Sequence, residues 1–386
     1  MSRLTMFAGL DYHQNVIQVC VQDHTGQVCL NRSCNNDPAE VTALLRQAGD
    51  VSEVSLEACC GAAAFGEALA AMGSWRVNLA HAGYVSRLRS SPDKTDFSDA
   101  RLLSDLTRVG YLPSVWLAPP EIRDLRQLVR HRQSLVNQRR NLKLQIGAAM
   151  REQRVKVPEH GRWSRLWVEA VREHAGLSSQ VRWIIQEKLE ELAWLSGRIE
   201  RACDRLRESS SHHDLYNRLR ELEGVGEVTA WTLLASIGRF DRFKNGKQLA
   251  RYCGLSPRNA SSGEKNADAG LVNACSRELR AVLIQCGHGL LRRPGRWREL
   301  ADKLKRRGKP TNVVVAAVAN RWVRSMHWRL VSAQAELTDK KKLSEKALTA
   351  KKLMEEDLSA KGLTTKKKLS AKNLTSKKHS IMKKCL

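Results

Sequence analysis

The sequence predicts a mixed α/β domain at the N-terminus, then two long helices, then a mainly helical C-terminal region. Three observations support this order. Short β-rich runs alternate with turn and helix signals over the first 110 residues or so, two long stretches with helical spacing follow, and the apolar helical segment "LEGVGEVTAWTLLASIG" lies in the last third. The chain has 386 residues, 42 % hydrophobic and 27 % charged, which is typical of a soluble globular protein with two or three domains.

The N-terminal region contains five candidate strands. "MFAGLD", "VIQVCVQ" and "GQVCLNRSC" are three β-rich runs, and "VSEVSLEA" and "WRVNLAH" are two more, separated by the helical stretch "GAAAFGEALAAMG". A helix between strands, after three consecutive strands, indicates a mixed α/β sheet. The segment from Thr95 to Val109 has helical spacing of its apolar residues.

Two long helices are expected after the proline-rich break "YLPSVWLAPPEI". Residues Glu121–Arg154 and Gln180–Arg207 have apolar positions at helical spacing and are dense in Arg, Gln, Leu and Glu. They could pair as an antiparallel or an intermolecular coiled coil. The arginines on the other faces, Arg139 and Arg140 among them, form either a solvated face or a contact with nucleic acid or a second subunit.

The last third of the chain combines a helical domain with a lysine-rich tail. Gly224 and Gly226 lie between two helical segments, as in a helix-hairpin-helix turn whose backbone amides approach a phosphate. Residues 337–386 carry 15 lysines and 5 acidic residues, and their leucines do not hold one helical face, which predicts a disordered polybasic tail. The predicted segments are 1–115 (α/β), 116–210 (coiled coil), 211–332 (helical) and 333–386 (tail).

The charge balance predicts a polyanionic partner. A formal charge of +26 and a pI of about 10.0 favour DNA, RNA or an anionic membrane surface. No apolar run approaches the ~20 residues of a membrane span, and the N-terminus lacks the apolar core of a signal peptide, so we expect a cytoplasmic protein. The ten cysteines contain no Cys-x-x-Cys pair, which argues for reduced thiols in apolar surroundings and against a zinc site.

Four carboxylates stand out as candidate metal ligands. Asp11 and Glu57 each end a predicted strand, in "GLDYH" and "SLEACCG", and Asp96 and Asp99 are three residues apart near a helix start. Each could alone be a helix-cap or turn residue. Together they could hold two divalent ions about 4 Å apart, which would polarise a phosphate and activate its attacker. Mg²⁺ suits such hard oxygen ligands, with Mn²⁺ as an alternative.

The order of these motifs resembles the transposases of the IS110 family of insertion sequences, and within it the IS1111 branch. These enzymes are also called bridge recombinases and are related to Piv-type DNA invertases. The resemblance rests on "GLDYHQ", "SLEACCG", "KTDFSDARLLSDL" and the run from "LEGVGEVTAW" to "GLSPRNASSG", and covers roughly residues 6–330. It implies a RuvC-like N-terminal domain of RNase H fold, with a DEDD metal site at Asp11, Glu57, Asp96 and Asp99.

The resemblance also implies a nucleophilic serine in "GLSPRNASSGEK". The serine directly before glycine is Ser262, which would attack DNA and form a transient phosphoserine link. Arg258 and Lys265 could hold the phosphate. From the residues alone, a plain polar turn explains this stretch better than a nucleophile does, because no base lies nearby in the sequence. The chain departs from the family pattern at Asn273 and Cys275, where Lys and Gly are usual.

These inferences predict an Mg²⁺-dependent DNA recombinase of a mobile element. The resemblance implies donor and target DNA and a structured bridge RNA as partners, with base pairing reading the sequence. It also implies a homodimer that assembles into a tetramer. Two alternatives remain open: a RuvC-like junction nuclease that uses water in place of Ser262, and a non-catalytic RNA- or DNA-binding protein.

Overall fold

The computed structural model describes residues 5–88, 95–156, 161–259 and 268–332. The chain divides into two compact units, Met1–Pro120 and Glu121–Leu386, which are considered separately below. The polybasic tail predicted for residues 333–386 lies outside the described ranges. Within those ranges, no helix has the length and apolar character needed to cross a membrane.

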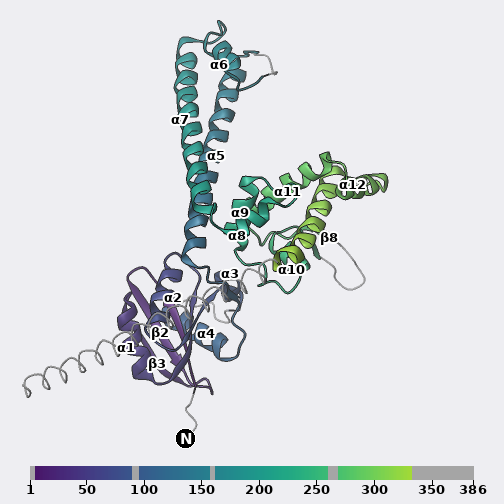
Figure 1. Cartoon of the computed structure of the whole chain (residues 1–386). Helices are drawn as coiled ribbons and strands as arrows, with labels where there is room; N and C mark the ends of the chain where they lie inside the picture. The colour runs from purple at the N-terminus through teal and green to yellow at the C-terminus, as the bar shows by residue number, and fades with distance from the viewer. Residues whose placement is uncertain (1–4, 89–94, 157–160, 260–267, 333–386) are drawn as a thin grey trace, which may run out of the picture. The chain divides into compact units, whose positions relative to one another are not determined.

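The first unit is built on a six-stranded mixed sheet (Figure 1). Its strand order is β3-β2-β1-β4-β5-β6, so the first strand lies in the middle of the sheet. Strands β1, β2 and β3 are antiparallel, β1, β4 and β5 are parallel, and β6 returns antiparallel to β5. The strands are β1 (Met6–Tyr12), β2 (Val16–Gln22), β3 (Val28–Asn35), β4 (Val51–Glu57), β5 (Arg76–Ala80) and β6 (Ser114–Val115). The prediction of a mixed α/β sheet is therefore confirmed.

Helices pack on this sheet in two separate apolar clusters. Helices α1 (Pro38–Ala48) and α2 (Ala62–Ala71) share one cluster with the central strands, through side chains such as Leu45 and Phe65. Helices α3 (Ala82–Leu88) and α4 (Asp96–Arg108) contribute Val85, Leu103 and Leu106 to the other. Helix α4 begins and ends where the sequence predicts, whereas α1 was not predicted.

The second unit begins with a long helical hairpin. Helix α5 (Pro120–Glu152) and helix α7 (Ser179–Ser210) lie side by side, and α6 (Arg165–Arg172) lies at their far end (Figure 1). Three contacts join them: Arg132 to Cys203, Gln145 to Lys188, and Gln153 to Ser178. Position numbers rise on one helix as they fall on the other, so the pairing is antiparallel and within one chain. Of the two predicted arrangements, the structure has the antiparallel one.

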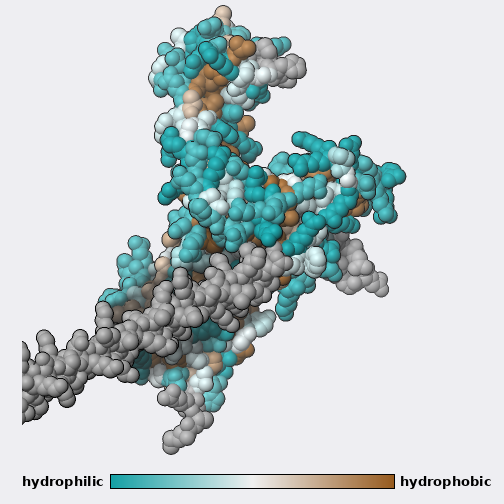
Figure 2. Space-filling view, viewed as in Figure 1, coloured by the Kyte–Doolittle hydropathy of each residue, from teal (hydrophilic) through white to brown (hydrophobic). Residues whose placement is uncertain are grey.

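Buried side chains form the seam of this hairpin. On α7 they recur every three or four residues, the spacing of a coiled-coil interface: Ile185, Leu189, Leu192, Leu195, Ile199, Cys203 and Leu206. Facing them, α5 buries Leu135, Leu142, Ile146 and Met150. The outer faces are largely hydrophilic, and exposed apolar patches gather toward the end that carries α6 (Figure 2).

Short helices follow the hairpin, with one small antiparallel sheet. They are α8 (Asp214–Arg220), α9 (Glu227–Ile237), α10 (Gly246–Tyr252), α11 (Arg277–Arg292) and α12 (Arg296–Arg306), and residues 311–332 are also helical. Strands β7 (Pro257–Asn259) and β8 (Asp268–Leu271) pair with each other. Helices α8 and α9 flank the glycine turn as predicted, and Trp231 of α9 is 1 % exposed in the core.

Candidate metal centre

The parallel pairing of β1 with β4 brings two predicted ligands to one edge of the sheet. Leu10 lies opposite Leu56 in this pairing, so Asp11 and Glu57 are the next residues along neighbouring strands. Both strands end within one residue of these positions. Carboxylates at the carboxyl ends of adjacent parallel strands lie at the same end of the sheet.

The other two predicted ligands occupy the first turn of α4. Thr95 caps this helix: its hydroxyl accepts a hydrogen bond from the Ser98 amide, and the Ser98 hydroxyl accepts one from the Thr95 amide, each 3.2 Å long. Asp96 and Asp99 follow the cap directly. The capping box therefore sets where the helix starts and which turn carries the two carboxylates.

Gly9 lets α4 lie directly on β1. A Cβ atom at Gly9 would be 2.1 Å from the Ala100 carbonyl oxygen and 2.4 Å from the Ser104 nitrogen, which no larger residue tolerates. Hydrogen bonds hold this contact, from the Ser104 hydroxyl to the Phe7 carbonyl at 2.8 Å and from Thr107 to Ser55 on β4 at 2.7 Å. The start of α4 is thus held against the ends of β1 and β4.

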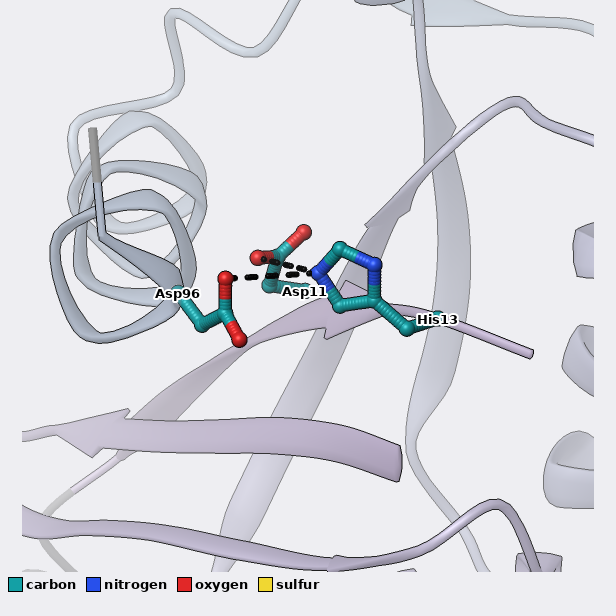
Figure 3. A group of neighbouring side chains, drawn as sticks. All are labelled: Asp11, His13 and Asp96. Atoms are coloured by element: carbon teal, nitrogen blue, oxygen red, sulfur yellow. Dashed lines mark hydrogen bonds and ion pairs between the residues drawn. The ribbon is translucent and has the colours of Figure 1, made fainter. Parts of the chain in front are cut away.

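Asp11 and Asp96 converge on the imidazole of His13 (Figure 3). Nε2 of His13 lies 3.1 Å from Oδ2 of Asp11 and 3.4 Å from Oδ1 of Asp96. Ionised carboxylates only accept hydrogen bonds, so Nε2 carries the hydrogen in these contacts. One ligand atom from each of the three residues falls within 4.8 Å of the others.

The carboxylates of this cluster act on one another electrostatically. Burial raises the pKa of Asp11, whose side chain is 13 % exposed, and the negative charges of Asp99 and Asp96 raise it further. His13 opposes these effects by its charge and its hydrogen bond. The side chain of Asp96 is 59 % exposed, whereas Asp99 is buried. Mutual repulsion of this kind favours a bound cation.

Glu57 approaches the cluster from the neighbouring strand. Burial raises the pKa of the Cys59 thiol, and the charges of Glu57 and of Asp11 raise it further. Both carboxylates therefore lie within electrostatic reach of one thiol. Gly61, just beyond it, has φ +89° and would place a Cβ 2.5 Å from the Tyr12 hydroxyl, so the turn after Glu57 requires glycine.

The donor set fits a hard divalent cation. Among the residues described, the group of three that could hold a metal ion is Asp11, His13 and Asp96, two carboxylates and an imidazole whose Nε2 would ligate only after losing its hydrogen. Asp99 acts on Asp11 through its charge, and Glu57 ends the neighbouring strand, but neither belongs to that group of three. The chemistry open to such a site is the polarisation of an anionic oxygen and the activation of a nucleophile.

The candidate serine lies in the segment that joins β7 to β8. Ser262, its neighbour Ser261 and Lys265 fall outside the described residues. Arg258 is on β7 with its side chain exposed. Gly254, which opens the motif, has φ +68°, and its Cβ would lie 2.2 Å from Sγ of Cys275. Cys275, one of the departures from the family pattern, thus packs against the turn that leads into this hairpin.

The two glycines of the predicted helix-hairpin-helix turn differ in their surroundings. Gly224 has φ +82° and faces α11, and its carbonyl accepts a hydrogen bond from the Cys286 thiol at 3.3 Å. Gly226 caps α9, and the space beside it is open. The predicted contacts Arg139 and Arg140 both lie on α5, with Arg140 exposed and Arg139 half-buried.

Sequence reasoning missed the residues that place the carboxylates. His13 lies two residues beyond Asp11 in "GLDYH", and this short spacing at a strand end was the available signal. Gly9 offered a signal as well, because a glycine inside a strand often marks the close approach of another backbone. Ser104 and Thr107 gave none, since polar residues on a helix are ordinary.

Comparison with known proteins shows similarity along most of the chain. Residues 8–154 match the model of a transposase domain named for DEDD transposases of IS110, and residues 216–302 match the model described as "Transposase IS116/IS110/IS902 family".

Curated relatives agree with these matches. A probable family 20 transposase of Pseudomonas aeruginosa is 28 % identical over 84 % of this chain and 96 % of its own length. The transposase for insertion sequence element IS1111A of Coxiella burnetii is 26 % identical over 74 % of this chain and 77 % of its own, and that for IS1328 of Yersinia enterocolitica is 24 % identical over 82 % and 94 %. With both family domains in order, the chain belongs to the IS116/IS110/IS902 family of transposases.

Proposed function

We propose that this transposase is a metal-dependent DNA recombinase that cuts and rejoins DNA through a serine. The observation that carries the proposal is the convergence of Asp11 and Asp96 at His13, with Asp99 and Glu57 nearby, in a chain of this family. The net charge of +26 supports a nucleic-acid partner. The RuvC-like character of the first unit agrees with its mixed sheet and central first strand.

Four residues of the first unit would hold the metal. Asp11 and Glu57 supply carboxylates from strand ends, and Asp96 and Asp99 supply them from the first turn of α4. Mg²⁺ is the expected ion, with Mn²⁺ as an alternative. When bound, such ions polarise the scissile phosphate and favour ionisation of its attacker. His13 holds the oxygens of Asp11 and Asp96 together.

Ser262 is the proposed nucleophile. Its hydroxyl oxygen would bond to the phosphorus of a DNA phosphodiester while the bond to one deoxyribose oxygen breaks. The serine proton leaves to a base, and the departing oxygen gains a proton and becomes a free hydroxyl. The phosphoserine bond retains the energy needed for rejoining. Arg258 and Lys265 would hold the phosphate oxygens.

Guidance by a structured RNA and assembly into dimers and tetramers complete the proposal. In this arrangement base pairing between RNA and DNA selects the sites, and the protein binds backbone and shape. Sequencing the RNA that co-purifies with the protein is the direct test. Enrichment of one RNA from the flanks of the element would support guidance, and a random sample of cellular RNA would refute it.

The carboxylates are tested by replacing Asp96 and Asp99 with asparagine in one chain. We expect recombination to fall by at least ~100-fold, because amides keep the shape and remove the charge that holds the cation. Asp105→Asn on the same helix is the control, since that carboxylate is ion-paired with Arg108. Undiminished recombination by the double variant would refute the metal site and favour a non-catalytic role for the carboxylates.

The serine is tested by comparing Ser262→Ala with Ser261→Ala. The two residues are adjacent and chemically identical, so only the nucleophile should matter for strand cleavage. We expect Ser262→Ala to abolish both cleavage and the covalent protein–DNA adduct, and Ser261→Ala to retain them. Cleavage by Ser262→Ala at the normal rate would point to a junction nuclease that uses water.

A further inference from the structure

A cation-lined cavity, open to solvent, lies in the second unit. It has a volume of ≈ 620 Å³ and is lined by Asn245, Gly246, Lys247, Arg321, Arg324 and Ser325. These residues come from the start of α10 and from the helical residues 311–332, which are adjacent in Figure 1. Segments about 75 positions apart in sequence thus build one site.

Two features fix these segments against each other. A Cβ atom at Gly246 would lie 2.7 Å from the Arg324 carbonyl oxygen and 2.8 Å from its Cα, so the two backbones are in direct contact. The same two segments also meet at a buried side chain, since Nε2 of His327 lies 3.0 Å from the Phe243 carbonyl oxygen. The wall of the cavity is therefore held in place by the packing of α10 against residues 311–332, and this packing sets the spacing of the side chains that line the cavity.

Three cations line this wall, and their charges are uncompensated within the described part of the chain. Lys247, Arg321 and Arg324 are exposed and make no ion pair with any described residue. Arg321 and Arg324 are three residues apart in a helical segment and so lie on one face. The carboxylate of Asp241, four residues before Asn245 in the sequence, is already held by Arg239 at 2.5 Å. Three adjacent cations without a counter-charge favour an anionic ligand.

Side chains, and not the start of α10, supply the binding groups. Oδ1 of Asn245 already accepts hydrogen bonds from the backbone amides of Lys247 (3.0 Å) and Gln248 (3.1 Å). The Ser325 hydroxyl donates its hydrogen to the Trp322 carbonyl at 2.8 Å, so it has no hydrogen left to donate to an anion. An anion in this cavity would therefore be held by one ammonium and two guanidinium groups, with Nδ2 of Asn245 as a further donor.

We propose that this cavity binds the phosphodiester backbone of the nucleic-acid partner. The proposal rests on the function proposed above in one respect, that the partner is a nucleic acid. One guanidinium group can donate two parallel hydrogen bonds to the oxygens of one phosphate, and an ammonium group adds a compact positive charge. Two guanidinium groups and one ammonium group therefore suit a run of consecutive phosphates. Small-molecule sites, in contrast, are mostly apolar and enclosed. Either DNA or RNA supplies this chemistry.

The test is a triple variant of the full chain, Lys247→Gln, Arg321→Gln and Arg324→Gln. Affinity is measured against salt concentration with two probes, a random duplex DNA and a structured RNA hairpin. The slope of log K against log salt is negative, and loss of three phosphate contacts should make it less steep by about 2.7 for the duplex. At 0.1 M salt the affinity should fall about 100-fold. A change with one probe only identifies which backbone occupies the cavity.

The matched control removes three cations elsewhere in the same unit: Arg165→Gln, Arg205→Gln and Arg218→Gln. Each of these arginines is ion-paired with a glutamate, so the net charge changes equally without emptying a phosphate site. A charge-retaining variant, Arg321→Lys with Arg324→Lys, should recover most of the slope. If the triple variant binds both probes as the control does, the cavity is not a phosphate site. Because the readout is binding, this result leaves the recombinase proposal standing.

Discussion

Gly9 is the residue on which the geometry of the carboxylates depends most. It brings the backbone of α4 onto β1, and Asp96 and Asp99 begin that helix. We predict that Gly9→Ala destabilises the first unit by on the order of 3 kcal/mol or more, since the added methyl meets backbone atoms that cannot turn aside. Faster hydrogen exchange in β1 and α4 would report the loss.

Gly289→Ala is the informative comparison for that variant. This glycine lies inside α11 with open space beside it, so alanine should stabilise the helix by about 1 kcal/mol. A loss of stability in Gly9→Ala together with a gain in Gly289→Ala would show that the close approach of α4 to β1 is what requires glycine at position 9. A neutral effect of Gly9→Ala on hydrogen exchange would contradict the packing of α4 described here.

The buried thiol of Cys286 predicts a pH dependence of stability. Burial raises its pKa from the ordinary 9.0 to about 12 in the folded chain. The folded state therefore binds this proton more tightly, and the thiol's contribution is fully present below about pH 9 and is lost as pH rises toward 12. Each such thiol makes the free energy of unfolding fall by up to about 1.4 kcal/mol per pH unit in that window.

Cys286→Ala should make that fall shallower. Urea denaturation at several pH values above 9, followed by circular dichroism, measures the slope for the variant and the wild type. Cys29→Ala removes an exposed thiol and serves as the control. An unchanged slope in Cys286→Ala would mean that the thiol does not titrate differently in the folded chain.

Single residues also mark how far sequence reasoning reaches. Asp11 and Asp96 could be chosen as candidate ligands because strand ends and helix starts are visible in the sequence. His13 could not be assigned to them, because its contact with Asp96 depends on how α4 crosses the sheet. The basic cavity was equally hidden, since Lys247 and Arg324 become neighbours only through Gly246.

At the scale of elements, the α5–α7 hairpin offers a matched pair of positions on one helix. Leu135 is 2 % exposed in the seam, and Leu144 is 58 % exposed. Leu135→Asp should destabilise the hairpin by about 3–5 kcal/mol because it buries a charge without a partner, whereas Leu144→Asp should be close to neutral. Limited proteolysis within α5 and α7 would reveal the difference, and equal resistance of both variants would contradict the seam.

Local signals explain which elements the sequence predicts. Helix α4 has a cap, a capping box and apolar spacing, and its bounds follow from these features. Helix α1 has a comparable start, with Asp37 as the cap, a proline in the first turn and Glu40 behind it, but its location after three strands drew no prediction. Strand β6 is two residues long and depends on pairing with β5, which no local signal encodes.

For the whole molecule, charge is the property with the clearest consequence. Residues 337–386 carry a net +10 of the chain's +26. A chain that ends at residue 332 should bind random duplex DNA at least ~10-fold more weakly at low salt, because fewer counter-ions are released. Its recombination at specific sites should persist. Binding assays across salt concentrations measure the first, and equal affinity of both chains would show that the tail does not contact DNA.

Antiparallel pairing makes the hairpin adjustable in length. Since Gln145 lies beside Lys188 and Arg132 beside Cys203, deleting 139–145 together with 188–194 removes seven residues from each side and keeps the seam in register. The hairpin would shorten by about 10 Å. If the hairpin sets the distance between two bound partners, recombination should stop once a series of such deletions makes the hairpin too short. The longest hairpin that fails would then give the distance that the hairpin has to span.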